Sequence, residues 1–202
     1  MDFNDNTKEA EFRTKVRKFL DENAQRRGEV IKTPTTAGAP ESVSGEKAAN
    51  DALMKAKEWQ KKKAEAGLAA IIWPKEFGGY GGSPIEQVIY QQEEHNYFVH
   101  SGYFEIGIGM LGPTMMVWGK DEDKKKYLPK MLTGEEIWCQ LFSEPAAGSD
   151  LAGIKMKAEK DGSDWILNGQ KVWTSGAHLS DYGMIVARSD PNAVKHKGLT
   201  YF

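Results

Sequence analysis

The spacing of the apolar residues changes near residue 134, and this change constrains the fold more than any other feature of the sequence. Before it, apolar side chains recur at helical spacing among charged neighbours, as at Phe12, Val16 and Leu20. After it, short runs rich in aromatic and β-branched residues alternate with turn signals, which is typical of strands. We therefore expect an α+β protein with a helical domain over residues 1–134 and a barrel-like or sandwich-like β domain over residues 135–202.

The first domain is predicted to contain amphipathic and buried helices. Ser83-Pro84-Ile85-Glu86 is a capping box with proline at the first helical position, which is a specific signal for a helix start. Residues 103–118 are apolar on nearly all sides and predict a buried helix. Residues 28–50 have no apolar period and predict a long surface loop. The expected helices cover residues 7–26 with Thr7 as the N-cap, 51–66, 84–98, 103–118 and 121–132.

The second domain is predicted to consist of short strands. Asp161-Gly162 and Asn168-Gly169 are turn signals, because glycine tolerates positive φ. The chain stops at Phe202 within an apolar run, and a natural terminus inside a strand would leave backbone groups unpaired. We therefore expect a truncated chain. The expected strands cover residues 137–142, 154–160, 165–167, 170–174, 182–188 and 199–202.

Charge and cysteine content exclude several classes of protein. The 202 residues carry a formal net charge of −2, which argues against nucleic acid as a partner. Cys139 is the one cysteine and is expected to be a buried thiol, and the N-terminus lacks the features of a signal peptide. The uncharged run over residues 106–119 is shorter than the ~20 residues that span a bilayer. These features predict a cytoplasmic protein with no membrane span.

The segment from Gln140 to Asp150 is a candidate ligand-binding loop. A strand is expected to end near Phe142, where Pro145 turns the chain and small residues with hydroxyls leave backbone N–H groups open to a ligand. Such groups suit a phosphate or the polar edge of a ring. The alternative is an ordinary transition from strand to loop, since loops rich in glycine, serine and proline are common.

A second candidate segment covers residues 168–177. A strand here would present Trp173 and Ser175 on the same face, so that a flat apolar surface lies beside a hydroxyl. This arrangement suits a planar heteroaromatic ring. The alternative is a tryptophan of the core beside a solvated serine, because tryptophan is highly buried on average.

Taken together, three segments give the chain a resemblance to the acyl-CoA dehydrogenase family. They read WPKEFGG at residues 73–79, SEPAAGSD at 143–150, where the family has Thr/Ser-Glu-Pro-x-Ala-Gly-Ser-Asp, and GQKVWTS at 169–175. Thr174 and Gly176 depart from the common Trp-Ile-Thr-Asn form. The resemblance covers essentially the whole chain. It implies a helical domain, a middle β domain and a C-terminal four-helix domain, before which this chain is expected to be truncated.

The resemblance also implies FAD as the cofactor and an acyl-CoA thioester as the substrate. The family reaction is an α,β-desaturation in which a carboxylate removes the α-proton while the β-hydride passes to N5 of the flavin. That base belongs to the C-terminal domain of the family, so we expect no catalytic residue in this chain and a structural role for Glu144. The cofactor-binding residues implied by the resemblance are Gln140, Phe142, Ser143, Gly148, Ser149, Trp173 and Ser175, with Ser149 also contacting the substrate.

The resemblance assigns different parts of the flavin to these residues. Phe142 and Ser143 are implied to line the ring through backbone amides and the Ser143 hydroxyl. Trp173 is implied to pack against the isoalloxazine, with the Ser175 hydroxyl near its N5 edge. Gly148 and Ser149 are implied to lie near the pyrophosphate and CoA. Hydrogen-bond donors at the flavin edge stabilise the negative charge that develops as hydride arrives.

Other functions fit the sequence less well or share the fold. We expect an electron acceptor like electron-transfer flavoprotein as a partner, and a dimeric or tetrameric homo-oligomer for the full-length protein. An acyl-CoA oxidase and a non-catalytic subunit of the same family remain as alternatives. No segment resembles the nucleophile elbow of a hydrolase, so Ser149 and His178 do not predict a catalytic triad. His95 and His100 are five residues apart and off a common helical face, so no metal site is expected.

Overall fold

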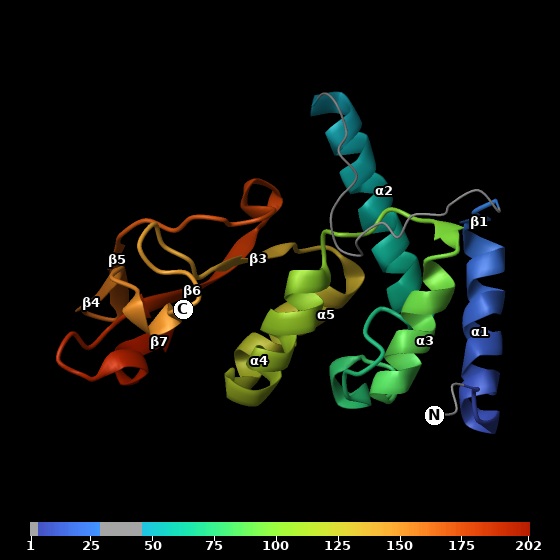
Figure 1. Ribbon diagram of the computed structural model, residues 1–202, viewed down its shortest axis with the longest axis horizontal. Helices are drawn as coiled ribbons and strands as arrows, with labels where there is room; N and C mark the ends of the chain where they lie inside the picture. Colours follow the sequence, from blue (N-terminus) through green and yellow to red (C-terminus); the bar gives the residue numbers. More distant parts are fainter. Residues whose placement is uncertain (1–3, 29–45) are drawn as a thin grey trace. The chain divides into compact units, whose positions relative to one another are not determined.

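The computed structural model describes residues 4–28 and 46–202. The chain divides into two compact units, Met1–Glu135 and Glu136–Phe202 (Figure 1). The first unit is built from helices, and the second contains a five-stranded sheet. The α+β class expected from the change in apolar spacing is therefore confirmed. Within the described residues, no helix combines the length and hydropathy that a membrane span requires.

Helix α1 (Thr7–Asn23) is capped by the residue that precedes the expected N-cap. The side chain of Asn6 accepts a hydrogen bond from the backbone N–H of Glu9 at 3.0 Å, and the Glu9 carboxylate accepts one from the Asn6 N–H at 2.9 Å. The prediction of Thr7 as the cap was wrong because Asn6 has the extended backbone of a cap.

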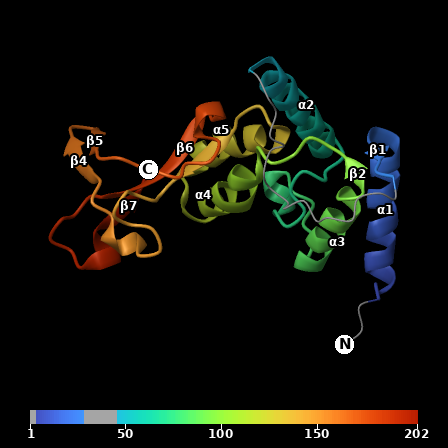
Figure 2. The same cartoon turned by 45° about the horizontal axis from the view of Figure 1, so that its top comes forward.

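Helix α3 (Pro84–Glu94) begins at the predicted capping box. Ser83 and Glu86 exchange both hydrogen bonds of the motif, which confirms this helix start. The helix ends before residue 98, where it was expected to end, because strand β2 (Tyr97–Phe98) pairs with strand β1 (Gln25–Arg26). The same pairing ends α1 earlier than expected (Figure 2).

Helix α2 (Glu46–Glu65) starts inside the stretch that was expected to be a loop. Residues 46–50 are helical, so this part of the prediction was wrong, whereas residues 29–45 lie outside the described chain. The first residues of α2 read Glu-Lys-Ala-Ala, all of them strong helix formers, which outweigh the missing apolar period.

The core of the helical unit forms where α1 packs on α3, and α2 packs on α5 (Asp121–Thr133). Each of these helices buries one face, and the long aromatic side chains fill the space between them. The buried residues of this core are Phe12, Val16, Leu20, Trp59, Leu68, Ile71, Ile89, Tyr90 and Tyr97.

The segment expected as one buried helix over residues 103–118 has two parts. A π-helical turn, η2 (Gly107–Leu111), is followed by the short helix α4 (Gly112–Trp118). Val117 and Trp118 are 67% and 83% exposed, so the expectation of burial on all sides was wrong. Gly112 packs against the buried indole ring of Trp73. One face of the segment is therefore buried, and the opposite face is exposed.

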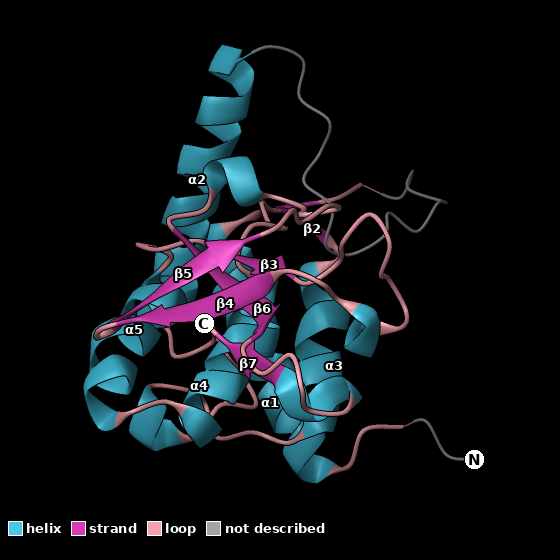
Figure 3. Ribbon diagram, turned by 90° about the vertical axis from the view of Figure 1, so that its left-hand side faces the viewer, coloured by secondary structure: helices cyan, strands magenta, loops and turns pink. Residues whose placement is uncertain are grey.

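The second unit is a mixed sheet with the order β3-β6-β4-β5, and β7 pairs with β6 (Figure 3). Strands β3 and β6 are parallel, whereas β4 and β5 form an antiparallel hairpin. Gly162 turns this hairpin with a φ of +60°, which confirms the turn expected at Asp161-Gly162. Cys139 is buried in β3, as expected. The strands are β3 (Trp138–Leu141), β4 (Lys157–Asp161), β5 (Asp164–Asn168), β6 (Tyr182–Arg188) and β7 (Leu199–Tyr201).

One expected strand, over residues 170–174, is absent, and another, expected over residues 154–160, begins only at Lys157. Residues 170–174 follow β5 without forming a strand, so the hairpin turn expected at Asn168-Gly169 was also wrong. Residues 154–156 precede β4, because the amides of Lys155 and Met156 bind a buried carboxylate instead of a neighbouring strand. The sheet therefore leaves two long loops, which carry the candidate site.

Candidate functional site

Two loops of the second unit are joined by hydrogen bonds. The serine loop comprises residues 142–150 after β3, and the tryptophan loop comprises residues 170–177 after β5. The Val172 N–H donates to the Ser143 carbonyl at 2.9 Å, and the Lys171 ammonium donates to the Phe142 carbonyl at 2.8 Å. Two segments that are far apart in the sequence thus form one surface.

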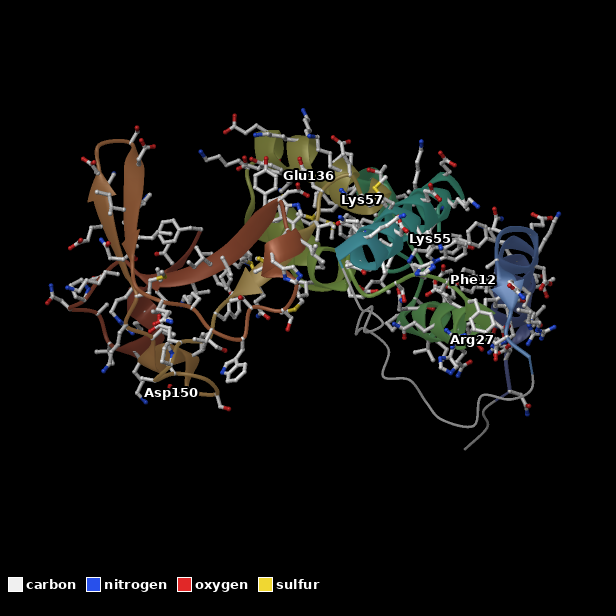
Figure 4. All side chains as sticks on the ribbon, turned by 90° about the horizontal axis from the view of Figure 1, so that it is seen from above. Phe12, Arg27, Lys55, Lys57, Glu136 and Asp150 are labelled. Carbon is white, nitrogen blue, oxygen red and sulfur yellow. The ribbon has the colours of Figure 1, made fainter. Side chains whose placement is uncertain are left out.

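A tight turn shapes the beginning of the serine loop. Glu144 and Ala147 exchange two backbone hydrogen bonds, of 2.8 and 3.1 Å, around Pro145 and the residue after it. Ala147 is buried in the core below the turn, whereas Gly148 onward is exposed. The turn therefore separates an anchored part of the loop from an exposed part, which ends at Asp150 (Figure 4).

The carboxylate of Glu144 anchors the serine loop from below. It accepts hydrogen bonds from the backbone N–H groups of Lys155 at 2.6 Å and Met156 at 2.9 Å, and from the Lys171 ammonium at 3.0 Å. Burial opposes its ionisation, but these bonds outweigh burial, so the pKa of Glu144 lies below its ordinary value. The structural role expected for Glu144 agrees with these contacts, which occupy both of its oxygens.

Trp173, in the tryptophan loop, has the most exposed large hydrophobic side chain among the described residues. Its φ is +58° and its side chain is 90% exposed. Positive φ is rare for a bulky residue and costs about 1–2 kcal/mol. The expected strand with Trp173 and Ser175 on one face is absent, and the indole instead projects from a loop. An exposed flat ring held at this cost is a feature of binding sites rather than of cores.

The remaining candidate residues lie around these two loops with different exposure. Gln140, in β3, and Phe142 and Ser143, at the start of the serine loop, are half-buried. Gly148, Ser149 and Ser175 are exposed. A β-carbon on Gly148 would meet no atom within 4 Å, so this glycine leaves open space above the loop. The structure therefore brings hydroxyls, backbone amides and an indole to the exposed side of the second unit.

Sequence reasoning missed two cations that hold loops of the second unit. Lys171 holds the two loops of the candidate site, whereas Arg188 joins the segments around residues 152 and 195. The side chain of Lys171 is only 5% exposed. The guanidinium of Arg188 donates to the carbonyls of Ala152 at 2.7 Å and Lys195 at 3.1 Å. Their positions in the sequence could have indicated a structural role, because Lys171 lies inside a motif and Arg188 ends an apolar strand. Lysine and arginine are mostly exposed to solvent, however, so neither was predicted to be buried.

The helical unit contains a cavity of about 280 Å³. Its lining includes apolar side chains, among them Trp73, and polar ones, among them Lys63, whose ammonium lies 3.8 Å from Glu94. A β-carbon on Gly109, at the edge of the cavity, would meet no atom within 4 Å. Across the described ranges of the chain, no three histidine, cysteine, aspartate or glutamate side chains are grouped to hold a metal ion.

The fold is a helical unit followed by a sheet unit that carries an exposed indole, and comparison with known proteins identifies its family. Residues 6–135 match the acyl-CoA dehydrogenase N-terminal domain, and residues 139–202 match the acyl-CoA dehydrogenase middle domain. The chain therefore belongs to the acyl-CoA dehydrogenase family, as its resemblance indicated.

Individual relatives agree with this family. The chain is 37% identical to the acyl-CoA dehydrogenase IpdE1 of Mycobacterium tuberculosis over 95% of its own length and 47% of that protein. A solved structure described as Tcur3481-Tcur3483 steroid ACAD has 29% identity and a TM-score of 0.73, over 100% of this chain and 48% of that one. The ChsE4-ChsE5 complex from Mycobacterium tuberculosis has 28% identity and a TM-score of 0.72, with 100% and 47% covered. The chain thus spans about half the length of these relatives.

Proposed function

We propose that this chain forms one wall of the FAD site of an acyl-CoA dehydrogenase. The observation that carries the proposal is the exposed indole of Trp173 on a loop bonded to the Ser143 carbonyl through Val172. With 90% of its side chain exposed, the indole gains little from packing in the second unit, whereas it can offer its face to a planar ring. Family membership makes isoalloxazine the ring to expect.

The side chains around the two loops fit a flavin by their chemistry. The hydroxyls of Ser143 and Ser175 and the amide of Ser143 can hydrogen-bond to the polar edge of the ring, and Phe142 contributes apolar surface. Gln140 lies in the strand that leads to these groups. The exposed backbone at Gly148 and Ser149 suits a pyrophosphate, since consecutive N–H groups bind anions.

FAD, when bound, supplies the capacity to accept a hydride from the β-carbon of an acyl-CoA thioester. The residues of this chain orient the ring, exclude water from one of its faces and offer hydrogen bonds to its edge. Glu144 is not the base of the reaction, because both oxygens of its carboxylate are occupied below the loop. We propose that the base lies outside the 202 residues.

The cavity of the helical unit supports a role in binding the acyl group. The open space at Gly109 and the apolar side chains of the lining give room for such a group, and Ser149 is proposed to contact the CoA. Electrons from the reaction would pass to an acceptor like electron-transfer flavoprotein.

A dimeric or tetrameric assembly and a cytoplasmic location remain predictions. The ChsE4-ChsE5 complex supports an alternative, in which the protein assembles with a second kind of subunit.

The proposal is tested on the complete protein that contains this chain. Purified with added FAD, it should show flavin absorbance that bleaches when an acyl-CoA substrate is added without oxygen. A colourless protein that binds neither FAD nor acyl-CoA would refute the enzyme reading in favour of a non-catalytic subunit. Rapid formation of peroxide in air would instead identify an acyl-CoA oxidase.

A further inference from the structure

Lys171 lies buried at the junction of the two loops, which is unusual for a lysine. Its ammonium donates to the Phe142 carbonyl at 2.8 Å and to the Glu144 carboxylate at 3.0 Å. The next residue, Val172, donates its N–H to the Ser143 carbonyl at 2.9 Å. The ammonium of Lys171 thus contacts the backbone of the serine loop, whose residues are proposed to bind the ligand, but it does not contact the ligand itself.

The contact with Phe142 affects a neighbouring donor. The carbonyl of Phe142 and the N–H of Ser143 belong to one peptide group. A cation that binds the carbonyl oxygen polarises this group and makes its N–H a stronger hydrogen-bond donor. In the part of the chain that the structure describes, no acceptor takes the Ser143 N–H. This donor is therefore available to a ligand on the surface of the serine loop.

We propose that Lys171 is a positioning residue that acts on bound flavin through the peptide group between Phe142 and Ser143. It holds the serine loop against the tryptophan loop, and it strengthens the Ser143 N–H as a donor to the edge of the ring. The inference rests on the proposed function, because the acceptor is the flavin. A stronger donor there favours the reduced cofactor, since reduction places more negative charge on the ring.

The ion pair with Glu144 means that Lys171 does not act on the flavin simply through the electric field of its positive charge. At 3.0 Å the carboxylate balances the charge of the ammonium, so little net field extends beyond the pair. Both side chains are less than 10% exposed, so bulk solvent does not replace either partner. The influence of Lys171 on the flavin therefore passes through the hydrogen bond to Phe142, which an apolar side chain of similar length, such as methionine, would lack.

The test compares variants of the complete protein reconstituted with FAD. Lys171→Met keeps the length of the side chain but removes the charge and the donor. We expect the FAD dissociation constant to rise by about threefold to tenfold, because the Ser143 N–H becomes a weaker donor to the ring and the serine loop is held less firmly. The midpoint potential of bound FAD should become more negative. Lys171→Arg keeps a cationic donor and should recover part of both losses. Lys160→Met, on an exposed position of β4, is the matched control and should leave both quantities unchanged.

The outcomes separate the inference from the function on which it rests. If wild-type protein binds no FAD, the proposed function fails, and the inference fails with it. If wild-type protein binds FAD and Lys171→Met keeps both its affinity and its midpoint potential, the inference alone is overturned. Thermal melting of each apoprotein reports folding. Should Lys171→Met not fold, Lys171→Gln retains a neutral donor and is expected to show a smaller negative shift in potential, whereas an unchanged potential would again overturn the inference.

Discussion

The indole ring of Trp73 fills the space in which a β-carbon on Gly112 would stand. An ideal β-carbon at Gly112 would lie 2.1 Å from Cζ2 of the ring. The ring cannot easily move away, because Trp73 is only 1% exposed and its Nε1 donates to the Ile108 carbonyl at 2.8 Å. Glycine at position 112 is therefore a packing requirement of the helical unit.

Gly112→Ala should lower the free energy of unfolding by about 2–3 kcal/mol, because the added methyl group forces the buried ring out of place. Gly109→Ala is the matched control from the same segment, since its β-carbon would meet no atom within 4 Å. It should change stability by no more than about 1 kcal/mol, in the stabilising direction, because alanine is the better helix former. Urea denaturation of both variants provides the measurement, and equal stabilities would contradict the packing argument.

Tyr97 should make the helical unit less stable as the pH becomes alkaline. Its side chain is 2% exposed, and its hydroxyl donates to Asp21 at 2.6 Å. Burial, followed by the bond to Asp21, raises the pKa of Tyr97 to about 12. Since the folded protein favours the neutral phenol, this stabilisation is present below the ordinary value of 10.0 and is lost as the pH rises towards about 12.

Tyr97→Phe should therefore cost about 1 kcal/mol at pH 7, the value of one hydrogen bond, and remove part of the alkaline loss of stability. Unfolding at neutral and alkaline pH, together with a tyrosinate absorbance titration, checks both effects. Tyr201→Phe is the control, because Tyr201 is 54% exposed. Burial, together with the neighbouring Glu94, also raises the pKa of Tyr90, so Tyr97→Phe should remove one late-titrating tyrosine and leave another. An unchanged late titration would show that Tyr97 does not carry a shifted pKa.

The elements that could be predicted from the sequence are those whose determinants are local. The capping box at Ser83 and the turn at Gly162 each depend on a few consecutive residues, and both formed as expected. The expected strand at residues 170–174 failed because its backbone is bonded to the serine loop, a contact between distant segments. Likewise, burial on all sides of residues 103–118 was inferred from apolar composition, which does not show which face packs on Trp73.

For the candidate site, the sequence indicated which segments matter but not how they are held. The two motifs identified the serine and tryptophan loops, and their order pointed to one family. The left-handed backbone of Trp173 carries no signal in its residue type, because tryptophan rarely adopts it. The burial of Lys171 depends on Glu144 and Phe142, and these partners become neighbours only in the folded unit.

Glu144 should make the second unit sensitive to acid. Its pKa is lowered from the ordinary value of 4.5, so its stabilisation is present above that pH and is lost as the pH falls through the folded pKa. Glu144→Gln leaves the buried Lys171 without a charged partner and should cost about 3 kcal/mol at pH 7. The difference in the free energy of unfolding between Glu144→Gln and wild type should become smaller below the pKa of Glu144 in the folded protein.

Urea denaturation at neutral and acidic pH measures this dependence. Glu159→Gln is the control, because Glu159 is exposed on β4 and should change stability by less than about 0.5 kcal/mol. If Glu144→Gln lost the same stability at acidic pH as at neutral pH, the loss would come from packing rather than from the ionised carboxylate.

Trp173 should contribute to binding at the expense of folding stability. Its positive φ is strained, and with 90% of the side chain exposed there is little packing to offset the strain. Trp173→Gly should leave the free energy of unfolding unchanged or raise it by up to about 1 kcal/mol, because relief of strain outweighs the greater freedom of glycine in the unfolded chain. The same change should weaken FAD binding by at least about tenfold, since the stacking surface is lost.

Trp165→Ala provides the opposite pattern in the same unit. Trp165 is 40% exposed and packs edge-on against Phe202 with ring centroids 5.1 Å apart, so its removal should lower stability by about 1–2 kcal/mol and leave FAD affinity unchanged. Urea denaturation and flavin titration of both variants complete the comparison. If Trp173→Gly destabilised the protein and kept its affinity for FAD, Trp173 would be a structural residue. Its exposure and its strained backbone would then not indicate a binding role.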